Sequence, residues 1–117
     1  MALERLPPSL TPLRETLARC LEAMNHVMPL RAVYLFGSHA RGDARPDSDV
    51  DLCLVADGAE NQLAAAQQFR RAMRPIQGKP SFTLVPIAPA RLAEKKAIGD
   101  FFFQSILDEG VILATQN

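Results

Sequence analysis

Hydrophobic residues near the start of the chain recur at spacings of three and four positions. This spacing places them on one face of a helix, because an α-helix completes a turn in about 3.6 residues. The pattern predicts an amphipathic helix over residues 12–28, with Ser9 or Thr11 as its N-terminal cap and Pro29 at its end. The residues that define this helix are Leu10, Leu13, Leu17, Cys20, Leu21 and Met24.

Three short hydrophobic runs, rich in branched or aromatic residues, predict β-strands over residues 31–36, 49–55 and 81–87. The polar stretch 42–48, which contains glycine and proline, indicates an exposed loop between the first two strands. Because this connection is short, a crossover helix between these strands is not expected. Pro86 lacks the backbone N–H that a central strand needs, so the third strand is expected at a sheet edge or to end near this proline.

Two further helices are predicted over residues 59–73 and 90–108, the second with a break near Gly99. A last short strand is expected at residues 111–113. No repeat or low-complexity linker interrupts the order of elements, so we expect a single domain over residues 1–117. The predicted fold class is α+β, with helices packed on a small mixed sheet.

The composition limits what the protein can bind and where it works. Among 117 residues, 48% are hydrophobic, which is enough for one ordinary core. The 13 basic and 13 acidic residues cancel, which argues against a broad nucleic-acid surface and against an anionic membrane as partner. The sequence shows neither a secretory leader nor a run of about 18 hydrophobic residues, so a cytoplasmic protein is expected. Cys20 and Cys53 are too few for a disulfide framework or a zinc site and are expected to be buried thiols.

Two acidic residues, Asp49 and Asp51, stand at the start of the second predicted strand. Side chains two residues apart in a strand share a face, so both carboxylates are expected together, while Val50 and Leu52 point into the core. Two neighbouring negative charges are unfavourable unless a cation or hydrogen-bond donors neutralise them. Oxygen-only ligands suit Mg²⁺ or Mn²⁺, so we predict a divalent-metal site. The plainer alternative is a solvated strand end.

The dipeptide Gly37-Ser38 ends the first predicted strand and begins a short helical turn. Glycine lets a phosphate approach the backbone closely, serine offers a hydroxyl, and free amides at a turn favour an anion. These features predict a phosphate-binding turn. Alone, the dipeptide would be an ordinary tight turn, but Asp49 and Asp51 favour a site for a triphosphate bridged by metal.

Two basic residues follow this turn, and each has a plain structural interpretation. Arg41 is equally well explained by contact with phosphate and by an ion pair to Asp43, Asp47 or Asp49 in the loop. His39 is expected to be a surface or partly buried histidine rather than a catalytic residue.

The segment GSHARGDARPDSDVDLCLV combines Gly37-Ser38, ten intervening residues and then Asp49-Val50-Asp51. It resembles the signature of the minimal nucleotidyltransferases of the DNA polymerase beta-like superfamily, and the resemblance extends over nearly the whole chain. It implies a polymerase beta-like nucleotidyltransferase fold and metal-assisted transfer of a nucleotide to an acceptor hydroxyl. By the same resemblance, Gly37 and Ser38 bind the triphosphate, Asp49 and Asp51 hold two metal ions, and Arg41 assists with charge or holds the loop.

One feature of that family is missing from this sequence. The family places a third carboxylate on the strand after the second long helix, where it ligates the catalytic metal. Aligning the family pattern on residues 81–87 puts Thr83 at that position, and no aspartate or glutamate lies between Asn61 and Arg91. A threonine hydroxyl is a poor magnesium ligand and a poor base, so nucleotide binding is a safer prediction than catalysis.

The sequence is therefore compatible with two functions. The first is a minimal nucleotidyltransferase that uses Mg²⁺ to move a nucleoside monophosphate, most simply AMP from ATP, to a hydroxyl acceptor. The second is a catalytically weak or inactive antitoxin that binds a helical HEPN-type partner protein, because short proteins of this kind resemble such antitoxins. Residues 101–103, three consecutive phenylalanines, cannot all face one core, and an exposed one would indicate an interface. A purely structural domain would leave the paired aspartates unexplained, and oligomerisation stays open.

Overall fold

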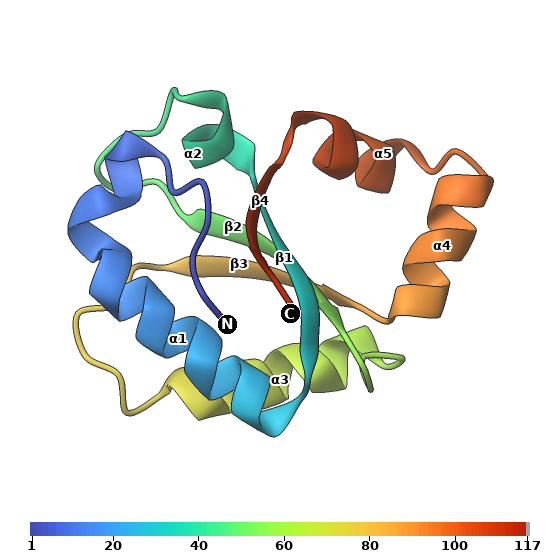
Figure 1. Ribbon diagram of the computed structural model, residues 1–117, viewed down its shortest axis with the longest axis horizontal. Helices are drawn as coiled ribbons and strands as arrows, with labels where there is room; N and C mark the ends of the chain where they lie inside the picture. The colour runs from blue at the N-terminus through green and yellow to red at the C-terminus, as the bar shows by residue number, and fades with distance from the viewer. Residues whose placement is uncertain (117) are drawn as a thin grey trace.

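The computed structural model describes residues 1–116, which form a four-stranded sheet with helices on both faces (Figure 1). The strand order is β3-β2-β1-β4; β1 is antiparallel to β2 and β4, and β2 is parallel to β3. The strands are β1 (Leu30–Phe36), β2 (Val50–Ala56), β3 (Phe82–Ile87) and β4 (Val111–Thr115). The helices are η1 (Pro8–Leu13), α1 (Arg14–Val27), α2 (Gly37–Arg41), α3 (Gln62–Met73), α4 (Pro89–Ala97) and α5 (Phe101–Glu109). This mixed sheet with packed helices confirms the predicted fold class.

The first helix differs from the prediction at its start. A 3-10 helix, η1, covers the residues around Pro12, and the regular helix α1 begins only at Arg14. Proline lacks a backbone N–H and disfavours the helical conformation of the residue before it, so the α-helix starts after it. The N-cap of α1 is Leu13, without a capping side-chain hydrogen bond, so the predicted cap at Ser9 or Thr11 was wrong.

The break predicted near Gly99 is confirmed, because α4 and α5 are separate helices. Gly99 has a φ of 69°, which a glycine adopts without strain. Asp100 then caps α5 by accepting a hydrogen bond of 3.1 Å from the backbone N–H of Phe103. This bond is the main reason why the pKa of Asp100 is lowered, and a 3.4 Å contact with the Lys95 ammonium adds to it. The corner between α4 and α5 is thus a defined structure.

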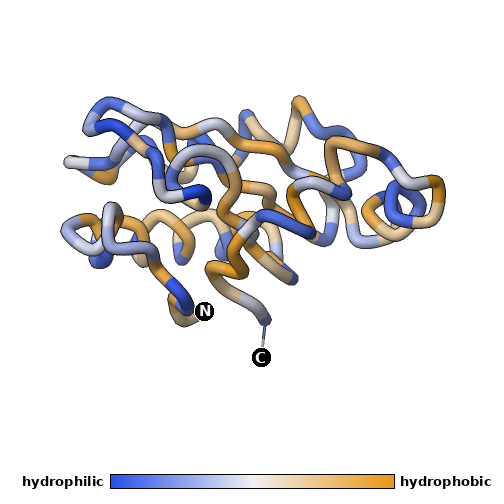
Figure 2. The backbone as a smooth tube through the Cα atoms, turned by 90° about the horizontal axis from the view of Figure 1, so that it is seen from above, coloured by the Kyte–Doolittle hydropathy of each residue, from blue (hydrophilic) through white to orange (hydrophobic). Residues whose placement is uncertain are grey.

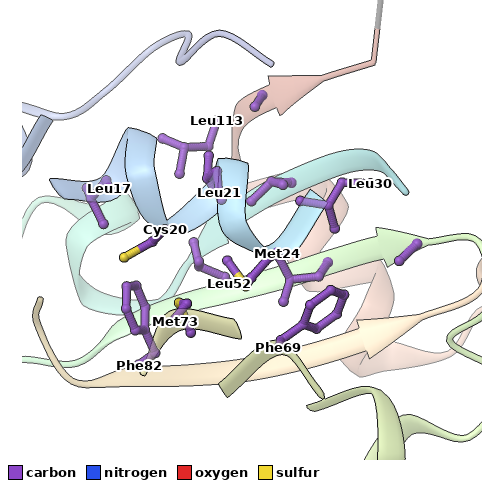
Figure 3. Close-up of a cluster of buried hydrophobic side chains, with 14 of the residues drawn as sticks. Leu17, Cys20, Leu21, Met24, Leu30, Leu52, Phe69, Met73, Phe82 and Leu113 are labelled. Atoms are coloured by element: carbon purple, nitrogen blue, oxygen red, sulfur yellow. The ribbon is translucent and has the colours of Figure 1, made fainter. Parts of the chain in front are cut away.

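Hydrophobic clusters lie on both faces of the sheet. On one face, α1 and α3 cover the larger cluster, in which Leu17, Leu21 and Met24 approach Leu52, Phe69 and Leu113 (Figure 3). On the other face, α4 and α5 cover a smaller cluster of Cys53, Val55, Ile87, Phe103 and Ile106. Both cysteines are buried as predicted. Burial raises the pKa of both thiols, that of Cys53 to about 12, so neither has the reactivity of a thiolate near neutral pH.

Polar chain surrounds this layered core. In Figure 2 hydrophobic segments gather toward the middle of the molecule and hydrophilic residues gather at its outer turns. β3 is an edge strand, which agrees with the interpretation of Pro86. The N-terminal segment runs beside β4, where the N–H of Glu4 donates to the carbonyl of Leu113 at 2.6 Å. Within residues 1–116, none of the helices has the length and hydrophobicity needed to cross a membrane.

Candidate functional site

The predicted aspartates and the glycine-serine turn meet at one end of the sheet. β1 and β2 run antiparallel, so the end of β1 lies beside the start of β2. Phe36, the last residue of β1, pairs with Asp51, and Gly37 follows directly. Gly37 and Asp51, more than a dozen positions apart along the chain, thereby become neighbours. The sequence predicted this arrangement if the two strands were adjacent.

The side chains of β2 alternate between the two faces as a strand requires. Val50 and Leu52 are fully buried in the cluster under α1 and α3, whereas Cys53 belongs to the cluster under α5. Asp51 therefore lies on the face that α5 covers. β2 begins at Val50, one residue later than predicted, which leaves Asp49 exposed just outside the strand.

Thr83 lies next to both carboxylates. It is the partner of Asp51 in the parallel pairing of β2 with β3. Its hydroxyl also donates a hydrogen bond of 3.4 Å to Oδ2 of Asp49. A side chain at position 83 is thus part of the same polar group as the two aspartates, on the strand where the sequence alignment expected it.

Gly37 is held against the carboxylate of Asp51. Its φ is 73°, in the left-handed region that side chains rarely adopt, and a Cβ added there would overlap Oδ2 of Asp51 and lie 2.9 Å from its Cγ. A side chain at this position would therefore displace either the turn or the aspartate. The glycine is required both for the bend that starts α2 and for the space that the carboxylate occupies.

We expect Gly37→Ala to lower the free energy of unfolding by about 3 kcal/mol or more, because left-handed strain and overlap with Asp51 add together. Gly42→Ala is the matched control: Gly42 also has a left-handed φ, 86°, but an added Cβ there would meet nothing within 4 Å. The control should lose only about 1–2 kcal/mol in urea unfolding. Equal losses for the two variants would contradict the close packing of Gly37 and Asp51.

A cleft of about 350 Å³ opens beside these residues, between α2 and α5. Both helices lie at the same end of the sheet in Figure 1. Four of the predicted site residues line the cleft: Gly37, Ser38, Arg41 and Asp51. Phe36, Ala40, Ser105, Ile106 and Glu109 complete its wall. Asp49 is not part of this lining and joins the group through its contact with Thr83.

Of the two interpretations of Arg41, the structure contains the ion pair, with Asp43 as the partner. Its Nε lies 3.5 Å from Oδ2 of Asp43, and both side chains are more than half exposed. An exposed ion pair of this kind contributes little to stability. Breaking the ion pair would therefore cost little free energy if the guanidinium turned to an anion in the cleft that Arg41 already lines.

His39 is more buried than the sequence indicated, with 7% of its surface exposed. Its Nδ1 lies 2.9 Å from the hydroxyl of Ser9, and its Nε2 lies 3.4 Å from the carbonyl oxygen of Ser48. A carbonyl only accepts, so we assign the ring proton to Nε2 and let the Ser9 hydroxyl donate to Nδ1. His39 thus links Ser48, the residue before Asp49, to Ser9 in the N-terminal segment. The local sequence around His39 does not indicate this role.

Ser105 and Glu109 are cleft residues that the sequence analysis missed. They lie four positions apart on α5, so they share one face of that helix. Nothing in their local sequence distinguishes them from ordinary solvent-facing helix residues. Only the packing of α5 beside the end of β1 brings them to the cleft.

The donor set at this site fits a metal ion that is shared with a substrate. Among residues 1–116, no three histidine, cysteine, aspartate or glutamate side chains gather into a metal-binding group. Mg²⁺ does not need such a group, because it commonly binds through one or two carboxylates and completes its shell with water and phosphate oxygens. Asp49 and Asp51 supply such a pair of carboxylates, and Gly37 leaves room for one of them.

A mixed sheet that carries paired aspartates opposite a glycine-serine turn is the arrangement expected of a nucleotide-transferring protein. Comparison with known families agrees: the nucleotidyltransferase domain matches residues 15–112. The chain therefore belongs to the nucleotidyltransferase domain family, and its general activity class is nucleotidyl transfer. This confirms the resemblance found in the sequence.

A solved structure supports the fold. The chain is similar to a crystal structure of a protein from Sulfolobus solfataricus named as a "putative nucleotidyltransferase", with a TM-score of 0.59 and 18% sequence identity. The similarity covers 92% of this chain and 85% of that one. At this identity the comparison concerns the fold alone. A search of curated proteins finds none that matches the chain.

Proposed function

We propose that this protein transfers a nucleoside monophosphate, most simply AMP from ATP, to a hydroxyl group of an acceptor molecule. The observation that carries the proposal is the packing of Asp51 against Gly37 in a cleft that Ser38 and Arg41 also line. A carboxylate beside an anion-binding turn would repel a phosphate bound there. A divalent cation between the carboxylate and a polyphosphate turns this repulsion into binding. In the transfer, the acceptor oxygen forms a bond to the α-phosphorus, the bond from that phosphorus to the pyrophosphate oxygen breaks, pyrophosphate leaves, and the hydroxyl proton passes to solvent.

Each residue of the site has a role in this transfer that follows from its chemistry. The backbone at Gly37, the hydroxyl of Ser38 and the guanidinium of Arg41 bind and orient the triphosphate. Asp49 and Asp51 are the residues that would hold Mg²⁺ or Mn²⁺, and a bound ion would neutralise phosphate charge and polarise the reacting phosphorus. Arg41 releases Asp43 when it turns to the phosphates, at small cost because that pair is exposed.

We also propose a second candidate function, an antitoxin that acts by binding a HEPN-type protein with little catalysis. One observation favours it: Phe101 is 87% exposed and Ile98 is 74% exposed at the corner between α4 and α5. The hydrogen bonds of Asp100 fix this corner, so the two side chains stand on a defined surface rather than on a loose loop. A fixed, exposed apolar group is a feature of protein-binding surfaces.

Transfer of label from [α-³²P]ATP in the presence of Mg²⁺ tests the two functions. The protein is incubated alone and with any HEPN-type protein encoded beside it. Incorporation of label into an acceptor supports nucleotidyl transfer. A stable complex without label, unchanged in the double variant Asp49→Ala/Asp51→Ala but weakened in Phe101→Ser, favours the binding role. Absence of both label and a complex would overturn both proposals.

A further inference from the structure

We propose that α5 forms the nucleoside side of the cleft and that Glu109 accepts hydrogen bonds from the sugar hydroxyls of a ribonucleotide. This inference rests on the proposed function, because it assigns a binding site to the nucleoside, the part of the nucleotide that the glycine-serine turn does not bind. The cleft has two chemically different walls. α2 presents Ser38 and Arg41, which suit an anion, whereas α5 presents Ser105 and the acceptor Glu109, which suit a ligand with hydrogen-bond donors.

The packing of α5 sets Glu109 close to the phosphate end of the cleft. Gly110, the next residue, is pressed against β1: a Cβ added to it would lie 3.0 Å from the carbonyl oxygen of Leu35. Leu35 is only two residues from Gly37, where the phosphate-binding turn begins. Ser105 lies about 6 Å farther along the helix, at 1.5 Å per residue. Glu109, the residue before Gly110, therefore lies at the end of α5 that packs beside the end of β1.

The charge of Glu109 decides which part of the ligand it contacts. A carboxylate only accepts hydrogen bonds and repels phosphate, so it pairs with groups that donate. In a nucleotide the first donors beyond the phosphates are the 2′ and 3′ hydroxyls of the sugar. Within residues 1–116, Glu109 does not gather with Asp49 and Asp51 into a group of three potential metal ligands.

An aromatic side chain of β1 lies beside the α5 wall. Phe36, the last residue of β1, lines the cleft, and its ring meets the half-exposed ring of Phe102 of α5 edge to face at 5.9 Å. Apolar and aromatic side chains with few convergent polar groups are typical of sites for small organic ligands. The cleft thus combines an acceptor for the sugar on α5 with the aromatic ring of Phe36 at the end of β1.

Nucleotide binding measured by calorimetry with Mg²⁺ tests this assignment. Because a hydrogen bond to a charged acceptor is lost, the native protein should bind 2′,3′-dideoxy-ATP at least about tenfold more weakly than ATP. Glu109→Ala should bring the two affinities to within about threefold, and Glu109→Gln, whose amide oxygen still accepts, should keep part of the difference. Asp108→Ala is the matched control, since it removes an adjacent charge of α5 that is not part of the cleft lining.

The outcomes separate this inference from the proposed function. Persistent discrimination in Glu109→Ala, or equal affinities in the native protein, overturns the role of Glu109 while leaving nucleotide transfer intact. An equal effect in Asp108→Ala also overturns it, because general charge repulsion would then be the cause. If the native protein binds neither nucleotide, the proposed function fails as well.

Discussion

Replacing Asp51 by asparagine should lower the rate of nucleotidyl transfer by on the order of a thousandfold while the protein stays folded. Asparagine has nearly the same shape, so the close contact with Gly37 can persist, but the negative charge that we propose as a metal ligand is gone. The rate is measured as label transferred from [α-³²P]ATP. Thermal unfolding with and without Mg²⁺ and nucleotide supplies a second readout: stabilisation by the two together should largely disappear.

Asp47→Asn is the matched control for this prediction. Asp47 is an exposed aspartate of the preceding loop and is not part of the cleft lining. Asp47→Asn removes the same charge from the protein as Asp51→Asn, so any loss of transfer rate due to net charge alone would appear in both variants. If Asp51→Asn retained activity within about tenfold of the native protein, a catalytic role for this cleft would be excluded.

Local patterns were sufficient to predict the strand that carries Asp51. The alternation of Val50 and Leu52 with polar neighbours determined which face each residue would take, because a strand has a side-chain period of two. That prediction is confirmed by the full burial of Val50 and Leu52. The location of the glycine-serine turn was predictable for the same reason, since a hydrophobic run ended at Gly37.

The other wall of the cleft was not predictable from local patterns. Ser105 and Glu109 are separated from Gly37 by more than half of the chain, and only the pairing of β4 with β1 brings α5 to the end of β1. The partners of His39 are hidden for a similar reason. Ser9 was interpreted as a helix cap, but its hydroxyl instead lies beside a histidine 30 residues later. Tertiary contacts of this kind override local preferences without leaving a pattern in the sequence.

Thr83 lies beside the two aspartates, on the strand next to β2. Its assignment as the substitute for a third carboxylate came from an alignment with the family. That assignment stays a prediction; the structure makes Thr83 the register partner of Asp51 and places its hydroxyl in contact with Asp49. An acidic residue at this position would add a third negative charge to the group. In the native protein a neutral hydroxyl stands there, which reduces repulsion in the absence of a cation.

Replacing Thr83 by aspartate should therefore change stability and activity in opposite directions. Without divalent metal, we expect thermal unfolding at a lower temperature, with a loss of about 1 kcal/mol, because like charges face each other across neighbouring strands. With Mg²⁺ or Mn²⁺ the variant should gain more stability than the native protein does, since the ion is drawn to three carboxylates. Label transfer should rise by at least about tenfold, and by up to on the order of a thousandfold.

Thr83→Asn separates charge from shape in this experiment. Asparagine is close in size to aspartate, so it should show neither the loss of stability in chelator nor the gain in rate. If Thr83→Asp becomes more stable on adding metal but no faster, the added carboxylate binds an ion that does not serve the reaction, and Thr83 is not what limits catalysis. If metal leaves the unfolding temperature of Thr83→Asp unchanged, the proposed metal site at Asp49 and Asp51 is wrong, because three clustered carboxylates on adjacent strands would bind such an ion more strongly than two.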